Sequence, residues 1–266
     1  MSKDVKVCAE ITHRYGELLV HDGLKLSVNE NEFLCVCGPS GCGKTTLLDI
    51  FAGILKPSQG QMLIDGTPAD PKRHNISFVF QEASTLPWLT VWDNIATGLR
   101  IKKQPAAEVK RKVDDIIGVV GLRGFEKYYP HQISGGMKQR VSIARAFATD
   151  ADLVLMDEPF VSLDQPTREK MQREVLSIWE HRKRTIIFVT HNLEEAVFLG
   201  DRVIMLSAKP ARIVADMVVD LPRPRDPLSA DFTTLRAHCS NLLQDLHAGT
   251  AAEEEAADRA AAAAAR

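Results

Sequence analysis

No run of apolar residues in this 266-residue chain approaches the roughly 20 that a membrane-spanning helix needs. Residues 1–4 also lack the apolar core of a secretory signal peptide. These two absences argue against a transmembrane or secreted protein, and we expect a cytoplasmic one. The length allows one large α/β domain, or a core with a subdomain and an appendage.

An excess of charge of one sign is also missing. The chain has 33 lysines and arginines against 35 aspartates and glutamates, which gives a formal net charge of −2. Proteins that gather nucleic acid by electrostatic attraction carry a marked positive excess. We therefore expect no nucleic-acid partner.

Cysteines are few, odd in number and scattered, which excludes a disulfide framework. Cys35 and Cys37 would lie on one face of a strand, where a metal pair is one interpretation. No pair of histidines or cysteines at ligand spacing completes such a site, so buried free thiols are favoured. A reducing cytosol fits this pattern. The cysteines are Cys8, Cys35, Cys37, Cys42 and Cys239.

Residues 38–46 match the phosphate-binding pattern G-x-x-x-x-G-K-[ST] at every fixed position. The run 33–37 before them has the length of a strand, and 47–55 after them has apolar residues at helical spacing. Such a glycine turn directs backbone N–H groups at phosphate oxygens. Lys44 adds a charge for the β- and γ-phosphates, and Thr45 offers a hydroxyl to Mg²⁺. The sequence thus predicts a site for a nucleoside triphosphate. Its members are Gly38, Pro39, Ser40, Gly41, Cys42, Gly43, Lys44, Thr45 and Thr46.

Strand-length apolar runs alternate with helical patterns along the chain. Strands are expected at 5–11, 23–28, 32–37, 61–65, 76–80, 153–156, 184–189 and 201–206. Helices are expected at 47–55, 109–120, 134–148, 166–182 and 193–199. This alternation predicts an α/β fold with a mainly parallel sheet and helices on its faces.

The composition divides the chain into parts. We expect the main domain to span 1–220, with a mainly helical insertion at about 82–150. The segment 221–250 is expected to hold a stiff, proline-rich linker and then an amphipathic helix that docks on the domain. The alanine-rich tail, 251–266, has no apolar face and is expected to be mobile and without a role.

Two carboxylates, Asp157 and Glu158, follow the apolar run 153–156 directly. In an enzyme with a phosphate loop, an aspartate there holds the Mg²⁺ shell, and the next glutamate orients or deprotonates the attacking water. A solvated acidic strand end is the disfavoured alternative, because a buried strand would deliver both groups beside the phosphates. Gln81 and His191 end two other strands, where they would reach Mg²⁺, the water or the γ-phosphate, but each alone is a weak signal.

A second glycine turn, Ser134-Gly135-Gly136, opens a helix with Ser134 as the candidate N-cap, and it also suits an anion. Two anion sites in one small domain are redundant if both serve one nucleotide. Tyr15 lies in a turn before the phosphate loop. Its ring either stacks on a nucleotide base or packs on the core.

In this order and spacing, the motifs make residues 5–220 resemble the nucleotide-binding subunit of an ATP-binding-cassette (ABC) transporter. The resemblance implies a P-loop NTPase (RecA-like) core with an antiparallel β subdomain and a helical signature subdomain. It also implies that Tyr15 stacks on adenine. Glu158, His191 and Gln81 would then act in ATP hydrolysis, with Mg²⁺ held by Thr45, Gln81 and Asp157.

The same resemblance implies partners for the chain. On ATP binding, two cassettes would form a head-to-tail dimer. Ser134, Gly135, Gly136 and Asp164 of one subunit would then face the nucleotide held by the other, which resolves the redundancy of two anion sites. Transmembrane permease subunits would hold the ATPase at the cytoplasmic face of the membrane, and a solute-binding protein would act with them. Met137 departs from the family consensus, which is Gln, and we expect activity to survive this change.

A narrower similarity, to the nitrate/sulfonate/taurine importer branch, covers 79–95, 207–213 and the linker 221–226. In that branch the segment after Gln81 forms the groove that takes the coupling helix of the permease. Trp88 is the better candidate for this contact, and Trp92 is expected in the core. The imported solute would be small and anionic or organic, and its identity would be set by the permease and the binding protein.

Three other functions remain as alternatives. A soluble ABC ATPase that acts on nucleic acid or ribosomes usually has tandem cassettes or a long coiled-coil insertion, and this chain has neither. A phosphate-loop kinase or small GTPase is disfavoured by the Ser134 turn and by the lack of an Asn-Lys-x-Asp motif. An inactive cassette would need to have lost Lys44 or Glu158.

Overall fold

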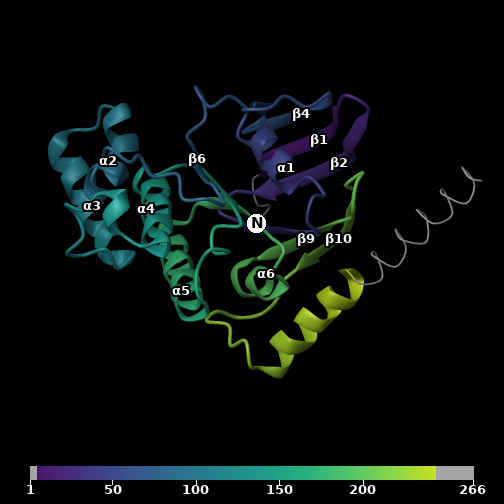
Figure 1. Ribbon diagram of the computed structural model, residues 1–266. Coiled ribbons are helices and arrows are strands. Elements are labelled where there is room, and N and C mark those ends of the chain that lie inside the picture. The colour runs from purple at the N-terminus through teal and green to yellow at the C-terminus, as the bar shows by residue number, and fades with distance from the viewer. Residues whose placement is uncertain (1–4, 244–266) are drawn as a thin grey trace, which may run out of the picture.

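The computed structural model describes residues 5–243 (Figure 1). Its strands are β1 (Val5–Tyr15), β2 (Leu18–Asn29), β3 (Phe33–Cys37), β4 (Gln59–Ile64), β5 (Thr67–Pro68), β6 (Ile76–Val79), β7 (Leu153–Asp157), β8 (Thr185–Thr190), β9 (Arg202–Leu206) and β10 (Ile213–Val218). Its helices are α1 (Lys44–Phe51), α2 (Val91–Ile101), α3 (Ala106–Val119), α4 (Gly135–Ala148), α5 (Gln165–Arg182) and α6 (Leu193–Leu199), with a 3₁₀ turn at Pro130–Gln132. A further helix runs over 230–243.

A six-stranded sheet with the order β10-β9-β3-β8-β7-β6 forms the centre of the molecule. The strands from β9 to β6 are parallel, as predicted, and β10 runs antiparallel to β9 at the edge. No strand was expected from the sequence at β10. Its side chains are only partly buried because it lies at an edge, so its apolar signal is weak.

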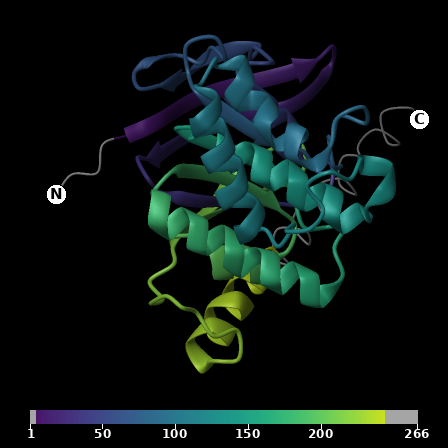
Figure 2. The same cartoon turned by 90° about the vertical axis from the view of Figure 1, so that its left-hand side faces the viewer.

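The two faces of this sheet bury alternate residues of each central strand. Leu34 and Val36 of β3 pack with α1 and with a second sheet, whose order is β2-β1-β4-β5. Cys35 and Cys37 of β3 pack on the opposite side with helices α4, α5 and α6. Figure 1 shows the antiparallel sheet and α1 together on one side, and Figure 2 shows the helices in front of the sheet. A continuous apolar strand buried on both faces was the basis of the parallel-sheet prediction.

The segment between β6 and β7 is helical, with α2 and α3 packed against α4. The sequence predicted a helix at 109–120, close to α3, but it did not predict α2. Trp92 lies in α2 between these helices, where its indole Nε1 donates to Asp114 Oδ1 at 3.0 Å. Its ring is partly buried against the core, as expected.

The proline-rich linker is packed on α6. The Arg225 guanidinium is buried and donates to the carbonyl oxygens of Val197 at 2.7 Å and Gly200 at 2.6 Å, which satisfies the end of that helix. The following helix buries Phe232 and Cys239 in the core. The proline-rich segment is therefore anchored to the domain by Arg225. The predicted helix position Leu246 and the tail 251–266 lie outside the described residues.

Within residues 5–243, no helix is long and apolar enough to cross a membrane. The thiols of Cys35 and Cys37 are buried and free, as expected. No group of three or more His, Cys, Asp or Glu side chains is placed to hold a metal ion in this described part of the chain. The metal-pair interpretation of the two cysteines thus gains no support.

Candidate active site

The predicted site residues, apart from those of the second glycine turn and Asp164, lie at one edge of the six-stranded sheet. Strands β3, β8, β7 and β6 are parallel neighbours, so their carboxyl ends and the loops that follow lie side by side. A pocket of about 380 Å³ opens there. Its walls are formed by Tyr15, Val20, Ser40, Gly41, Gly43, Lys44, Thr45, Thr46, Gln81, Glu158 and Lys209.

The phosphate loop between β3 and α1 has the glycine conformation that its sequence predicted. Gly43 has φ +109°, which favours glycine, and a Cβ there would lie 2.5 Å from Val20 Cγ1 and 2.9 Å from His21 Nε2. The buried His21 ring lies 3.1 Å from the Gly43 carbonyl oxygen, and burial lowers the pKa of His21. Helix α1 begins at Lys44, so its first N–H groups face the pocket.

Lys44 is held under the loop with its ammonium group at the pocket. The side chain is only 6% exposed, and its Nζ donates to the carbonyl oxygens of Gly38 and Pro39, each at 2.9 Å. The same Nζ lies 3.8 Å from Glu158 Oε1. A buried ammonium with two backbone partners and one carboxylate has a fixed position, from which it can meet an incoming phosphate.

Asp157 and Thr45 form an oxygen pair at the pocket, which Thr45 lines and Asp157 approaches from the end of β7. The Thr45 hydroxyl donates to Asp157 Oδ2 at 2.7 Å, and Asp157 is 5% exposed. Burial raises the pKa of the Asp157 carboxyl; the Thr45 hydrogen bond acts against the rise, and the charge of Glu158 adds to it. A buried carboxylate and hydroxyl with little compensating charge are ligands that suit Mg²⁺.

Glu158 follows β7 in a strained conformation and pairs with His191. Its φ is +42°, in the left-handed region, and its N–H donates to the Val189 carbonyl oxygen at 2.9 Å. Glu158 Oε2 lies 2.7 Å from His191 Nδ1. The carboxylate therefore lies between Lys44 on one side and His191 on the other. The sequence placed these residues at strand ends but could not show their contact.

Tyr15 and Gln81 line the pocket from opposite elements, β1 and the loop after β6. Tyr15 is 52% exposed, and it packs against the buried His13 ring with a centroid separation of 4.8 Å at 84°. Its ring is therefore outside the core, which favours the first of the two sequence interpretations. Gln81 is exposed at the pocket wall, where its amide has access to a ligand.

The second glycine turn does not take part in this pocket. Ser134 caps α4, where its Oγ accepts from Met137 N at 3.3 Å, as predicted. Asp164 caps α5 by accepting from Thr167 N at 3.2 Å. None of Ser134, Gly135, Gly136 and Asp164 lines the pocket, although all four fall within the described residues. A Cβ at Gly135 would meet no atom within 4 Å, so the turn is open to a partner.

Sequence reasoning missed three residues at the site: Val20, His21 and Lys209. The first two belong to β2 and support the phosphate loop from a different sheet, which no local motif reveals. Lys209 follows the carboxyl end of β9, a parallel neighbour of β3. Its place after a parallel strand was the one signal that could have identified it.

The chain is similar in sequence to known proteins. Residues 21–161 match the family model described as ABC transporter. The chain is 49% identical over 224 residues, 84% of each chain, to an uncharacterized ABC transporter ATP-binding protein of Methanocaldococcus jannaschii. It is 44% identical over 221 residues, 83% of this chain and 87% of the relative, to the aliphatic sulfonates import ATP-binding protein SsuB of Bacillus cereus.

Two solved structures resemble the fold. The ATP-binding cassette MJ0796, as a dimer in a post-hydrolysis state bound to ADP and phosphate, has a TM-score of 0.72 and 29% identity over 81% of this chain and 100% of that one. CbiO1 of Clostridium perfringens, part of the ABC transporter complex CbiONQ, has a TM-score of 0.73 and 25% identity over 82% of this chain and 90% of that one. The chain belongs to the ABC transporter family of ATP-binding subunits, and it is an ATP hydrolase.

Proposed function

We propose that this chain hydrolyses Mg-ATP in the pocket at the edge of the six-stranded sheet and thereby drives a permease that imports a small anionic solute of the sulfonate, nitrate or taurine kind. The observation that carries the proposal is the Glu158 carboxylate, which is held between Lys44 and His191. The sulfonate import subunit among the relatives supports the solute class. Because the relatives are named as transporter subunits, an action on nucleic acid or ribosomes is not favoured.

The pocket residues divide between the parts of the nucleotide. The phosphates lie on the loop 38–46, where the α1 N-terminus and Lys44 supply positive charge. The exposed face of Tyr15 takes the adenine ring by stacking. Thr45, Asp157 and the Gln81 amide would hold Mg²⁺, which would supply positive charge to the phosphates.

Glu158 and His191 act on the attacking water. With its backbone fixed by the hydrogen bond to Val189, the Glu158 carboxylate accepts the proton of a water placed in line with the γ-phosphate. His191 bonds the other carboxylate oxygen, so it orients Glu158, and its partly exposed ring is free to meet the transferred phosphoryl group. Lys44 stabilises the charge that develops on that group.

Dimerisation follows from the position of the second glycine turn. Ser134 and the exposed Gly135 open helix α4 away from the pocket, so the N–H groups at this helix N-terminus face no phosphate of their own subunit. In a head-to-tail dimer this turn, with Asp164, covers the γ-phosphate held by the partner. The dimeric cassette among the similar structures supports this arrangement.

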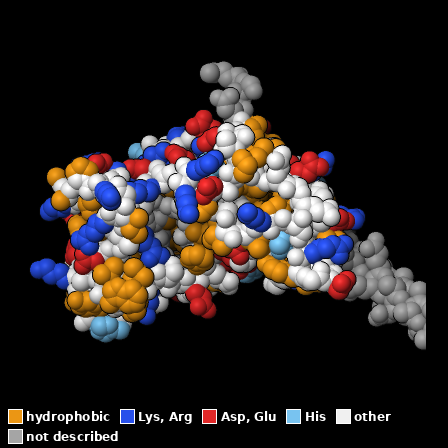
Figure 3. Space-filling view, turned by 90° about the horizontal axis from the view of Figure 1, so that it is seen from above, with side chains coloured by type: hydrophobic (Ala, Val, Ile, Leu, Met, Phe, Trp, Pro, Cys, Tyr) orange, Lys and Arg blue, Asp and Glu red, His pale blue; other side chains and the backbone are white. Residues whose placement is uncertain are grey.

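A rigid loop beside α2 presents an aromatic surface for the permease. The buried Asn94 side chain bonds Leu86 through both its oxygen and its nitrogen, and it also donates to the Leu89 carbonyl oxygen at 3.0 Å. Trp88 stands on this loop with 70% of its surface exposed. Figure 3 shows hydrophobic side chains gathered on the part of the molecule that holds α2 and α3. An exposed tryptophan on a loop fixed by hydrogen bonds is typical of a protein interface.

A Glu158→Gln variant tests the catalytic proposal. The amide keeps the shape of the side chain but removes its basicity, so hydrolysis should fall by roughly 10²–10⁴, the range for loss of a general base. ATP should still bind because Lys44, Thr45 and Asp157 are unchanged. The bound ATP is not consumed, so the variant should accumulate as an ATP-dependent dimer on size exclusion.

The matched control adds Ser134→Arg to Glu158→Gln. The arginine would block the turn that faces the partner's γ-phosphate, and the ATP-dependent dimer should disappear while each subunit still binds ATP. A Glu158→Gln protein that stays monomeric at saturating Mg-ATP, or that hydrolyses ATP at the wild-type rate, contradicts the proposal.

The permease surface is tested by Trp88→Ala. Because the indole is largely exposed, the melting temperature should change little, whereas co-purification with the co-expressed permease should weaken by about tenfold or more, the effect of losing an interface anchor. Trp92→Ala provides the contrast. The Trp92 indole is partly buried against the core and donates to Asp114, so its loss should lower the melting temperature. Equal loss of stability in both variants would show that Trp88 has no special role in assembly.

A further inference from the structure

The turn 207–212 lies beside the candidate active site. It belongs to a segment that carries the narrower similarity to the importer branch, but no motif in the sequence assigned it a part in nucleotide binding. It follows the carboxyl end of β9, which pairs in parallel with β3, so it emerges at the same edge as the phosphate loop. Lys209, on this turn, forms part of the pocket wall together with Tyr15, Ser40 and Gly41. A lysine is thus placed where the pocket already gathers groups for an anion.

Hydrogen bonds within the turn fix its shape. Ser207 N donates to the Arg212 carbonyl oxygen at 3.0 Å, and Arg212 N donates to Ser207 Oγ at 3.0 Å. The Arg212 guanidinium forms an ion pair with Asp22 of β2. The charge of Arg212 is therefore used in holding the turn, and Lys209 is the cation of this turn that faces the pocket.

Contacts with β2 fix the position of the turn relative to the phosphate loop. Ala211 is buried, and its N–H donates to the Val20 carbonyl oxygen at 2.8 Å. Val20 is the residue whose side chain closes against Gly43 of the phosphate loop. The backbone of Lys209 is thus tied, through one strand, to the loop that would hold the phosphates. A side chain whose backbone is already held in place loses less conformational entropy when it binds a ligand.

The charge of Lys209 is available for a ligand. Its side chain is exposed, and it forms no ion pair within the described residues, whereas Lys44 is already bonded to two carbonyl oxygens and lies near Glu158. The charge of Lys209 also acts on a residue of the phosphate loop, Cys42. Burial raises the pKa of the Cys42 thiol, and the positive charges of Lys44 and Lys209 both act against that rise.

We propose that Lys209 is a further nucleotide-binding residue, whose ammonium group contacts the phosphate chain of ATP or ADP in addition to Lys44. This inference rests on the proposed placement of the nucleotide in the pocket. An ammonium on a rigid turn supplies a charge-assisted hydrogen bond to a phosphate oxygen. Lys209 would set the affinity for nucleotide without acting on the attacking water.

Titration of the purified full-length chain with Mg-ADP and Mg-ATP tests this role. For an exposed charge-assisted contact, Lys209→Ala should raise Kd about fivefold, and Lys209→Glu about 20-fold or more, because it replaces attraction by repulsion. Lys209→Arg keeps the charge and should stay within about twofold of wild type. In hydrolysis assays KM should rise while kcat is retained, and added salt should reduce the difference between wild type and Lys209→Ala.

Two controls separate the possible failures. Lys56→Ala removes another exposed lysine that precedes a proline but does not line the pocket, and it should bind nucleotide like wild type. A Lys209→Ala protein that binds as tightly as Lys56→Ala, with an unchanged melting temperature, overturns the role of Lys209. Lys44→Ala in the same titration tests the pocket itself: wild-type affinity there would overturn the proposed site, whatever Lys209 does.

Discussion

Two aspartates lie near opposite ends of β7, and their surroundings differ in a way that separates structure from function. Asp150 precedes the strand and Asp157 is its last residue. Both are partly or fully removed from water, and in both cases burial raises the pKa of the carboxyl. The net outcome is opposite, because the pKa of Asp150 ends below its ordinary value and that of Asp157 above it.

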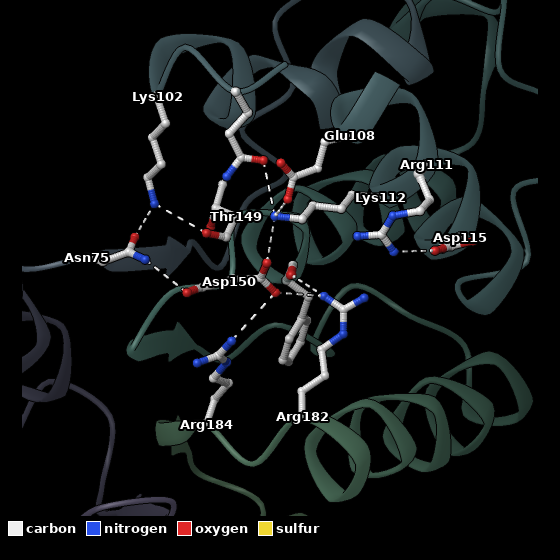
Figure 4. A network of polar contacts seen from close by, with 12 residues as sticks. Asn75, Lys102, Glu108, Arg111, Lys112, Asp115, Thr149, Asp150, Arg182 and Arg184 are labelled. Atoms are coloured by element: carbon white, nitrogen blue, oxygen red, sulfur yellow. Dashed lines mark hydrogen bonds and ion pairs between the residues drawn. The ribbon is translucent and has the colours of Figure 1, made fainter. Parts of the chain in front are cut away.

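Asp150 is surrounded by cations. Its carboxylate lies 2.8 Å from Lys112 Nζ, 3.1 Å from Arg182 and 3.6 Å from Arg184 (Figure 4). The Lys112 hydrogen bond and the two guanidinium groups outweigh the effect of burial on its pKa. These contacts join α3 to the ends of α5 and β8, so the cluster holds the helical region on the sheet.

Asp157 accepts a hydrogen bond from the Thr45 hydroxyl and lies beside a second carboxylate, Glu158. Lys44, the cation of this group, is placed 3.8 Å from Glu158 and is also bonded to two backbone carbonyl oxygens. Negative charge at this end of β7 is therefore under-compensated in the protein alone. A balanced cluster stabilises the fold, whereas an unbalanced one is suited to a ligand that brings the missing positive charge.

The largest expected effect is the loss of Mg-ATP affinity when Lys44, the lysine near Asp157 and Glu158, is removed. Lys44→Ala takes away the buried point charge that faces the phosphates, and Mg-ATP affinity should fall by at least about 100-fold, the upper range for a charge-assisted contact. Isothermal titration with Mg-ATP measures it. Binding within about threefold of wild type would put the phosphate-loop assignment in serious doubt.

The comparison becomes sharper with Asp157→Asn, which should have opposite effects on function and stability. Mg-dependent hydrolysis should fall by about 100-fold or more, because a charged metal ligand is lost. The folded-state pKa of Asp157 is raised, so the ionised group destabilises the fold above that pKa, and the penalty disappears at acidic pH where the group is protonated.

At pH 7, without nucleotide or Mg²⁺, Asp157→Asn should therefore melt at a higher temperature than wild type. The difference should shrink as the pH falls toward the unperturbed value of 3.8. A variant that melts lower than wild type would contradict the view that this end of the strand is strained by uncompensated charge.

Asp150→Asn should lower stability, in contrast to Asp157→Asn, and should have the smallest effect on ATP hydrolysis. Its loss leaves Lys112 and Arg182 without their shared partner, so we expect about 1–2 kcal/mol less stability at pH 7 in urea unfolding. The folded-state pKa of Asp150 is lowered. Its contribution is thus present above the unfolded value of 3.8 and is lost as the pH falls through the folded value.

Asp152→Asn is the matched control for Asp150→Asn. Asp152 is an exposed neighbour whose one ion pair, within the described residues, is with Arg184 at 3.9 Å. It should change stability by less than about 0.5 kcal/mol. If Asp150→Asn reduced the free energy of ATP binding more than the free energy of unfolding, Asp150 would have a role in function. The distinction between a structural and a functional end of β7 would then be wrong.

Much of the site could be predicted because its parts are local in sequence. The phosphate loop, Asp157-Glu158 and the capping Ser134 each follow or precede a recognisable strand or helix, and parallel strands bring their carboxyl ends to one edge. The edge strand β10 and helix α2 were missed. The side chains of β10 alternate between partial burial and exposure, so its apolar signal is weak. Helix α2 does carry a helical signal, because Val91, Ile95 and Leu99 are buried at a spacing of four residues, and this signal was overlooked.

The sequence by itself determined the phosphate loop, the parallel α/β fold and the order of the catalytic groups, because the chemistry of each depends on neighbouring residues. The tertiary structure alone decided which charges are balanced. Lys112 of α3 meets Asp150 together with Arg182 and Arg184 from the end of α5 and the turn after it. Val20 and His21 of β2 and Lys209 of the turn after β9 likewise lie beside the phosphate loop. Coulomb energies depend on distance and burial in space, and neither can be read from separation along the chain.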